Sequence, residues 1–487
     1  MSLRLSGKRL VKSQTKGYIT VFLSLSIMII LSLVLALFQG ARIGAVRMKT
    51  ECVADISINS VLSEYSRALY EQYGLLMVDA SYGTGNHSIT NVQDHLRNYA
   101  QKNFDRSRPG GLMNAQTMTA MYCKDARISG YSVATDNNMA VLSRQIMAYM
   151  EGEPIGDLMS GVLENVGSLQ SGELDTIDVD ELARENQELI DSFEPPVIEK
   201  ENGEKEIISI GNPADVVNSQ RGIGALNLAI RDKSSISTAR VNIQDYASHR
   251  DLNRGTGLDE AGVSGGQNLI FDQYYYEKCS RYGAELEKSL LKYQLEYLAY
   301  GQESDYANLE KMARTLLFWR QASNMLYLFG CEAKVSEADL LASALSIILF
   351  LPELKDPIKY SILFAWTFAE SISDLHILFS GGRVPLFKSD STWKLSLTNM
   401  FSFRDHLGSD CREGLYYQDY LRIKLFLTDA ETKLRRMADV IEMDVRRTDG
   451  NGSFMLDYCV DIIRAELEIG TRFGYEASIE RIYGYER

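Results

Sequence analysis

The sequence lacks the cysteine spacings that mark zinc sites and disulfide-rich scaffolds. Its six cysteines are widely scattered, and no C-x-x-C pair occurs. Structural zinc sites need closely spaced cysteine or histidine ligands, so no such site is indicated. An isolated pair of cysteines could form a disulfide, but free thiols buried as small apolar side chains are the favoured interpretation. The six are Cys52, Cys123, Cys279, Cys331, Cys411 and Cys459.

Motifs for cofactor binding and catalysis are also missing. There is no phosphate-binding loop and no dinucleotide fingerprint, and the five histidines show no H-E-x-x-H spacing. Residues 262–266 read GVSGG and match G-x-S-x-G, but a catalytic serine of this type needs a strand before it and a helix after it. A polar, glycine-rich stretch precedes Ser264, which favours a flexible loop. We therefore assign no catalytic residue, cofactor or metal ligand, and we expect no enzymatic activity.

Positive charge is outnumbered by negative charge, and a small group of positive residues lies at the N-terminus. The chain has 51 Lys and Arg against 65 Asp and Glu, a formal net charge of −14. Nucleic-acid binding depends on Lys and Arg, so nucleic acid is not an expected partner. Five positive residues with no acidic residue among them precede the first apolar run, and without them the rest of the chain carries −19. These residues are Arg4, Lys8, Arg9, Lys12 and Lys16.

One long apolar run stands out near the N-terminus. The 21 residues from Tyr18 to Phe38 carry no charge, and as a helix they span roughly 32 Å, the thickness of a bilayer's hydrocarbon core. The exit at residues 38–42, FQGAR, is a poor signal-peptidase site. The run therefore predicts a retained transmembrane helix, with a cleaved signal or an interfacial helix as alternatives. Because positive flanks stay in the cytoplasm, we expect a cytoplasmic N-terminus and an extracytoplasmic remainder.

Small residues recur along the predicted span at multiples of four. In lipid, apolar surface gives helices no reason to associate, whereas small residues on one face allow close backbone approach. The pattern therefore predicts a packing groove for another membrane helix, either a pilin-like subunit or a second copy. Small residues are also tolerated in such helices without any partner, and both interpretations stay open. The pattern comprises Ser24, Ser32, Ala36, Gly40 and Gly44.

Beyond the span the sequence predicts a mixed unit, a linker and a helical region. Residues 42–73 continue as a helix, 92–104 form a second helix, and 126–135, ARISGYSVAT, have strand composition. Asn202-Gly203 predicts a hairpin that pairs Ile198 with Ile207. That register also opposes Lys200 to Lys205, an unfavourable arrangement that indicates a weakly held hairpin. The following residues up to Gly266 look irregular.

The C-terminal half is helical in pattern. The stretches 340–351 and 358–379 are apolar, but the first is short and charged residues interrupt both the connection and the second stretch. Core helices of a soluble domain are therefore favoured over further membrane spans. Arg320, Glu370 and Asp374 lie within apolar helices, where a buried ion-pair network is favoured over a catalytic carboxylate pair. A single helix is expected over 416–446, and a β-hairpin near the end of the chain.

Two sets of residues resemble known families. Lys16-Gly17, the apolar helix and residues 40–65, GARIGAVRMKTECVADISINSVLSEY, resemble the start of TadE/TadG-like pseudopilins of the tight-adherence (Tad) pilus system. Such proteins have a basic tip, one apolar helix, an arginine just beyond it and an Ala-Asp-containing continuation, which Arg42 and Ala54-Asp55 match in kind. Prepilin-peptidase substrates carry glutamate five residues after the glycine, but Phe22 stands there. A retained, unprocessed anchor is expected.

The second resemblance covers most of the chain. Residues 293–329 and 362–388 are similar to a long, uncharacterised membrane-anchored family of clostridia-like Gram-positive bacteria, commonly encoded beside Tad pilus genes. The resemblance implies a non-enzymatic, membrane-anchored extracytoplasmic component or accessory of a Tad-type pilus or secretion assembly. A surface sensor or adhesin ectodomain is the alternative, and a cell-envelope hydrolase the third. The implied partners are membrane lipid, other pilus-assembly or pilin-like membrane proteins, and a second copy of the chain.

The expected fold class is α+β and mainly helical. An N-terminal transmembrane helix extends into a pilin-like unit of helix and strands, and a larger helical domain follows and ends in the β-hairpin. The expected segments are a basic cytoplasmic tip (1–16), a transmembrane helix (17–40), an extracytoplasmic pseudopilin-like unit (41–193), a hairpin and flexible linker (194–266) and a mainly helical domain (267–487).

Overall fold

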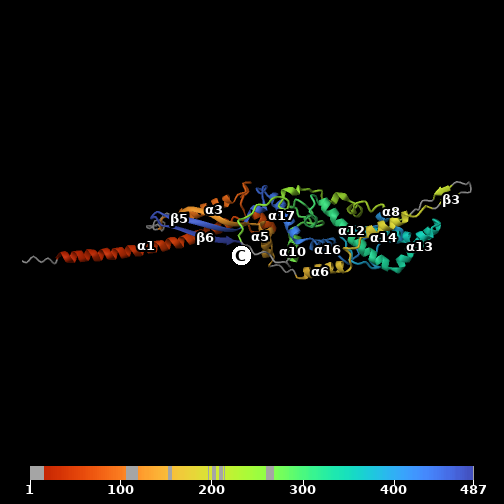
Figure 1. Ribbon diagram of the computed structural model, residues 1–487, viewed down its shortest axis with the longest axis horizontal. Coiled ribbons are helices and arrows are strands. Elements are labelled where there is room, and N and C mark those ends of the chain that lie inside the picture. Colours follow the sequence, from red (N-terminus) through yellow and green to blue (C-terminus); the bar gives the residue numbers. More distant parts are fainter. Residues whose placement is uncertain are drawn as a thin grey trace, which may run out of the picture.

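The N-terminal helix runs far out of the rest of the molecule. The computed structural model describes residues 16–105, 119–151, 156–195, 197–199, 205–207, 212, 214–258 and 268–485. Helix α1 (Lys16–Leu62) is unbroken over 47 residues, since no proline interrupts it. Its first half is exposed on all sides, while its second half lies against the body of the protein (Figure 1). The predicted long N-terminal helix is thus confirmed. Its expected continuation through residue 73 was wrong, because α1 ends at Leu62 and Ser66 caps a separate helix, α2 (Arg67–Tyr73).

A small antiparallel sheet receives the second half of α1. Strand β5 (Cys459–Thr471) is central, with β2 (Met121–Val133) along one edge and β1 (Val78–Asp79) and β6 (Glu476–Gly484) along the other. Helix α3 (Ile89–Asp105) packs beside α1 and against β2. The core between them holds Val46, Val53, Ile58, Leu96, Ala126, Ile463 and Leu467, among others.

The sheet joins the two ends of the chain. Strands β5 and β6 form the expected C-terminal hairpin, which is confirmed, and β5 also pairs with β2 and β1 from the first 133 residues. The segments predicted as a unit over 41–193 and a separate domain over 267–487 therefore share one sheet. Among the described residues, β5 is the strand that β1 and β2 both pair with, which satisfies their backbone groups.

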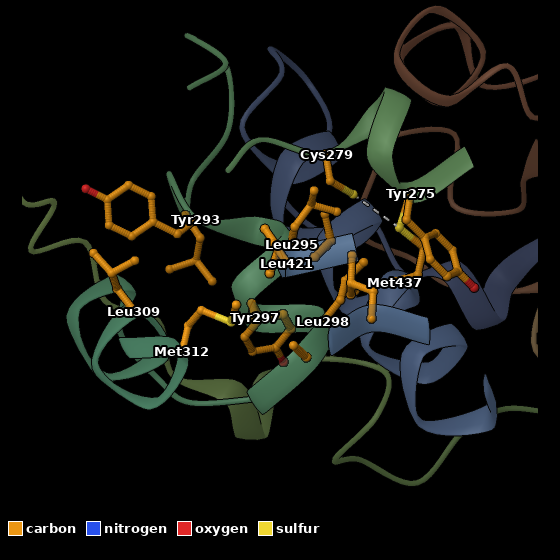
Figure 2. Close-up of a cluster of buried hydrophobic side chains, with 14 of the residues drawn as sticks. Tyr275, Cys279, Tyr293, Leu295, Tyr297, Leu298, Leu309, Met312, Leu421 and Met437 are labelled. Atoms are coloured by element: carbon orange, nitrogen blue, oxygen red, sulfur yellow. Dashed lines mark hydrogen bonds between the residues drawn. The ribbon is translucent and has the colours of Figure 1, made fainter. Parts of the chain in front are cut away.

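The helical body lies beyond the sheet. Short helix α11 (Gln294–Tyr300) sits at its centre, with all but its last residue buried. Figure 2 shows Leu295 and Leu298 of α11 between Leu309 and Met312 on one side and Met437 on the other. The helices of this body are α2 (Arg67–Tyr73), α5 (Asp136–Met150), α6 (Gly156–Ser171), α7 (Val179–Asp191), α10 (Asn268–Lys278), α12 (Asp305–Gly330), α13 (Glu332–Ile348), α14 (Lys355–Phe379), α15 (Leu397–Met400), α16 (Tyr417–Phe426) and α17 (Ala430–Arg446). The mainly helical α+β fold class is confirmed.

The two apolar helical stretches of the C-terminal half differ in their surroundings. Helix α14 is almost entirely buried, so the prediction of a core helix over 358–379 is confirmed. For 340–351 the prediction was wrong, because α13 lies at the surface. Only Ala338, Ala342 and Ser346 of α13 are buried, spaced by four and facing α14. These small residues let the helices approach closely, which leaves the larger Leu340 and Ile347 in solvent.

The hairpin of β3 (Val197–Glu199) and β4 (Lys205–Ile207) has a register one residue away from the predicted one. Ile198 pairs with Glu206 and Glu199 with Lys205, so the expected pairing of Ile198 with Ile207 was wrong. The predicted register would have set Lys200 opposite Lys205, which is an unfavourable arrangement. Asn202 and Gly203 lie outside the described residues.

The segment between this hairpin and α10 lies against the helical body over most of its length. Residues 214–258, expected to belong to a flexible linker, contain short helices α8 (Asp215–Asn218) and α9 (Ala225–Ala229) with buried apolar side chains. Further along, the Ser248 amide donates to Asp439 at 2.7 Å and the Asn253 amide to Asp457 at 2.8 Å. These bonds to buried carboxylates hold the segment in place, and its local sequence did not reveal them.

The expected single helix over 416–446 is two helices. It breaks after Phe426, and Asp429 begins α17 as its N-cap by accepting the Thr432 amide at 2.8 Å. Aspartate at this position satisfies an amide that a helix start leaves unpaired. The sequence did not reveal this boundary, because the helical spacing of apolar residues is similar before and after residues 427–429. The remaining elements are single 3-10 turns: η1 (Lys233–Ser235), η2 (Ile243–Asp245), η3 (Pro352–Leu354), η4 (Phe403–Asp405) and η5 (Leu456–Tyr458).

Candidate functional site

The exposed half of α1 is the first candidate site. Two of the described helical stretches are long and apolar enough to cross a membrane, Gly17–Leu62 and Pro352–Phe379. The most apolar window of the first has a mean hydropathy of 2.9 and none of it is buried, whereas 94% of the second is buried. An apolar surface of this length with no protein covering is what a bilayer accommodates. Helix α1 therefore could serve as a single membrane span.

The structure brings only part of the small-residue pattern together. A helix turns about 100° per residue, so each step of four residues moves about 40° around the axis. Ala36 and Gly40 therefore share a face, Ser32 and Gly44 flank it, and Ser24 lies about 160° from Gly40. All five are exposed, and side chains added at Gly40 and Gly44 would meet nothing else in the chain. A close approach by another helix would therefore be centred on Ala36 and Gly40.

The serines of the pattern are already satisfied within the helix. The Ser24 hydroxyl donates to the Val21 carbonyl at 2.9 Å, and the Ser32 hydroxyl donates to the Ile29 carbonyl at 2.8 Å. A hydroxyl paired in this way carries little desolvation cost in lipid. These serines can therefore face either lipid or another helix.

The basic tip is mostly beyond the described part of the chain. Arg4, Lys8, Arg9 and Lys12 lie outside the described residues, and Lys16 is the first residue of α1. The argument for a cytoplasmic N-terminus therefore rests on the sequence alone.

A clamp holds α1 where it leaves its apolar run. The Arg42 guanidinium lies 3.7 Å from the centroid of the Phe473 ring, and Arg47 Nε donates to the Tyr475 hydroxyl at 3.1 Å. Phe473 and Tyr475 belong to the turn between β5 and β6, and their rings stack on one another. Sequence analysis singled out Arg42 but missed its partners, because nothing local links residues more than 400 positions apart.

The Ala-Asp pair of α1 also meets the C-terminal hairpin. Ala54 is fully buried in the core between α1 and the sheet, and Asp55 Oδ1 lies 3.4 Å from Arg481 Nε on β6. The Tyr485 hydroxyl donates to the Leu62 carbonyl near the end of α1. The last strand of the sheet therefore fixes the direction in which the apolar half of α1 leaves the body.

A second candidate site is a group of charged side chains inside the helical body. Arg320 on α12 donates from Nε to Asp374 Oδ2 at 3.0 Å, as predicted. The sequence missed Lys388, whose Nζ lies 2.6 Å from Asp374 Oδ1 and 2.7 Å from Glu370 Oε1. All four side chains are completely buried. Two positive and two negative charges balance, which is what allows them to be buried together.

This buried network fastens a loop onto α12 and α14. Glu370 accepts the backbone amides of Lys394 and Leu395, each at 2.9 Å. Arg320 Nη1 donates to the carbonyls of Pro385 and Leu386 at 2.8 and 2.9 Å. Lys388 and Arg320 lower the pKa of Asp374 despite its burial, whereas burial raises the pKa of Glu370. Each acidic oxygen is engaged inside the chain, so the geometry favours a structural role over acid–base chemistry.

Histidines and cysteines do not combine into a metal site within the described residues. His87 Nε2 bonds the Ser453 carbonyl at 2.7 Å, whereas His95 Nδ1 bonds Glu64 Oε2 at 2.8 Å and its ring stacks on Tyr82. The two histidines are thus held by different partners. The six cysteines are all described and all free, with Cys279 and Cys459 buried and Cys52 exposed. Ser264 lies outside the described residues.

Glu296 on α11 is a buried carboxyl group that sequence analysis did not single out. One carboxyl oxygen accepts the Tyr417 hydroxyl at 2.7 Å and the Tyr282 amide at 3.1 Å, while the other has no hydrogen-bond partner among the described residues. Burial raises its pKa from 4.5 to about 7. The folded protein therefore holds a proton on Glu296 between pH 4.5 and 7, where the unfolded chain releases it.

Stability should consequently fall as the pH rises through that window. The contribution of Glu296 is fully present below pH 4.5 and is lost by about pH 7, and the shift corresponds to on the order of 3 kcal/mol. Chemical denaturation of the wild type and of Glu296→Gln at pH 5 and pH 8 measures this. We expect the glutamine variant, which cannot titrate, to show a smaller difference between the two pH values. If the free energy of unfolding changed equally in both proteins between pH 5 and pH 8, Glu296 would not be the cause of the pH dependence.

A comparison with known families matches the larger, mainly helical part of the chain. Residues 201–471 match DUF5702, a family of unknown function. The chain belongs to this family. No curated protein and no solved structure matches this chain. The DUF5702 region contains the buried network and strand β5, whereas α1, α3 and β2 lie outside it.

Proposed function

We propose that this protein is a non-enzymatic, membrane-anchored extracytoplasmic component or accessory of a Tad-type pilus or secretion assembly. The observation that carries the proposal is α1, one continuous helix whose first half is apolar and exposed and whose second half packs on an antiparallel sheet. The resemblance of the N-terminus to TadE/TadG-like pseudopilins implies this same combination. Arg42 and the Ala54-Asp55 pair, which carry that resemblance, make contacts that fix α1 to the sheet.

The DUF5702 region, residues 201–471, also supports a structural role for the protein, because this region is built onto α1. It supplies β5, the central strand on which α1 rests, so the family-specific part and the pseudopilin-like part fold together. Glu370 and Asp374, the carboxylates considered for catalysis, are paired inside the body. Partners in the membrane would be pilin-like proteins or a second copy, meeting α1 at Ala36 and Gly40.

The topology of this proposal gives a direct expectation. The positive tip should stay in the cytoplasm, with everything after Arg42 outside. Protease added to intact protoplasts should digest the sheet and the helical body, while an epitope placed before Arg4 stays protected until the membrane is opened. Protection of the C-terminal region in intact protoplasts would contradict this orientation.

Deletion of the gene tests the function itself. We expect loss of pili or of the secreted assembly from the cell surface, with recovery when the wild-type gene is returned. Ser264→Ala should restore the assembly as well as the wild type does, because no catalytic step is assigned to it. A strain that lacks the gene and still builds normal surface assemblies would contradict the proposal. A defect confined to attachment or signalling would instead favour the adhesin or sensor alternative.

A further inference from the structure

An open cleft lies on the helical body, and none of the residues that line it belongs to α1 or to the buried charged network. It forms where the C-terminus of α14 meets the N-terminus of α16, with the loops at Ser235 and at residues 281–285 on its sides. Its volume is about 500 Å³. Small-molecule sites typically occupy 300–1,000 Å³, so the cleft is large enough for a ligand of two sugar rings.

Aromatic side chains make up one side of the cleft. The ring of Tyr282 lies 5.5 Å from that of Phe379 and 5.6 Å from that of Tyr417, and the last two are 5.2 Å apart. Tyr416 lines the same cleft and is 41% exposed. Aromatic faces offer large apolar contact at a small cost in conformational entropy.

Hydrogen bonds behind the cleft hold this aromatic side in place. The Tyr417 hydroxyl donates to buried Glu296 at 2.7 Å, and the Tyr282 hydroxyl donates to the Phe379 carbonyl at 3.1 Å. The Tyr282 amide donates to Glu296 as well. A site whose walls are already ordered needs little rearrangement on binding, which favours affinity.

The other side of the cleft is polar and balanced in charge. Arg281 and Glu285 both line it. Arg281 is positioned by the Tyr276 ring, 4.3 Å from its guanidinium, and by the Gln418 amide oxygen at 3.4 Å. An arginine, a carboxylate and an amide are planar groups that can each bond two neighbouring hydroxyls.

We propose that this cleft binds a neutral carbohydrate of about disaccharide size. A sugar ring has one apolar C–H face and a rim of hydroxyl groups, which matches an aromatic wall beside planar polar groups. The opposite charges of Arg281 and Glu285 cancel, so the cleft has no net attraction for an acidic or basic ligand. This site goes beyond the proposed role in assembly, because it gives the helical body a ligand of its own.

The test uses the full-length protein in detergent and a panel of cellobiose, maltose and N,N′-diacetylchitobiose, with binding followed by saturation-transfer NMR and titration calorimetry. Two cleft variants are Tyr416→Ala, which removes the exposed ring, and Ser235→Trp, which fills the space without removing a wall. Tyr360→Ala is the matched control, since Tyr360 is also 41% exposed but lies elsewhere on α14.

We expect at least one disaccharide to bind the wild type. Each cleft variant should weaken binding at least tenfold, and Tyr360→Ala should leave it within twofold. Circular dichroism establishes that each variant is folded, and Ser235→Trp keeps the test decisive if Tyr416→Ala is unstable. Absence of binding to every disaccharide, or equal binding by wild type and both cleft variants, would overturn the proposal. Binding of short tyrosine-containing peptides without any sugar would assign the cleft to peptides instead.

Discussion

Replacing Lys388 with methionine is expected to lower the free energy of unfolding by about 3–5 kcal/mol. The substitution keeps much of the side-chain volume but removes the cation that lies 2.7 Å from Glu370 and 2.6 Å from Asp374. One negative charge then remains uncompensated in a place without solvent. Chemical denaturation of the full chain in detergent, followed by tryptophan fluorescence, measures the effect, because Trp366 and Trp393 both lie in the adjoining core.

Lys355→Met is the matched control for this change. Lys355 also forms an ion pair, at 2.9 Å from Asp339, but both side chains are more than one third exposed. Exposed pairs contribute between about 0 and 1 kcal/mol, so this variant should be close to wild type. If the two methionine variants lose similar amounts, the network does not fasten the loop of residues 383–395, and its structural interpretation fails.

Replacing Ile58 with alanine is the second change with a large expected effect. Ile58 is fully buried between α1 and the sheet, in the same core as Leu467 of β5. Removing its methyl groups should lower the free energy of unfolding by about 2–5 kcal/mol, because the rigid sheet cannot close the cavity. Ile56 provides the control on the same helix, since its side chain is half exposed.

The comparison of these two isoleucines also tests how α1 is held. Ile56→Ala should change stability by no more than about 0.5 kcal/mol. Limited proteolysis should then release the C-terminal hairpin of Ile58→Ala earlier than that of Ile56→Ala, because β5 and β6 lose their packing on α1. Equal effects of the two substitutions would mean that α1 and the sheet are not one folded unit.

Local patterns predicted those features that depend on neighbouring residues. The apolar run predicted α1 and the apolar stretch at 358–379 predicted α14. The position of Arg320 and Asp374 within apolar helices predicted that they pair. The alternation of apolar and polar residues over 464–486 predicted the β5–β6 hairpin. Each of these follows from a periodicity or a charge count that a short window contains.

Features that depend on distant residues could not be predicted in this way. Lys388 comes from a loop without periodicity, so only the folded chain brings it to Glu370 and Asp374. The pairing of β2 with β5 joins residues more than 320 positions apart. Likewise, the exposed face of α13 depends on how closely Ala338 and Ala342 approach α14, which composition does not reveal.

The claim that α1 assembles as well as anchors is tested most directly by filling the groove at Ala36 and Gly40. A transmembrane-association reporter carrying residues 16–45 compares the wild type with the double variant Ala36→Ile, Gly40→Ile, against itself and against pilin-like membrane helices. Leu31→Ile, Val34→Ile is the matched control, because these residues lie on roughly the opposite face of the helix. Membrane insertion of all three should be equal, since isoleucine preserves the apolar character.

The account predicts that the Ala36→Ile, Gly40→Ile variant loses association by on the order of 1 kcal/mol or more, while the control keeps the wild-type signal. Equal signals from all three helices against every partner tested would contradict the account and leave α1 as an anchor alone.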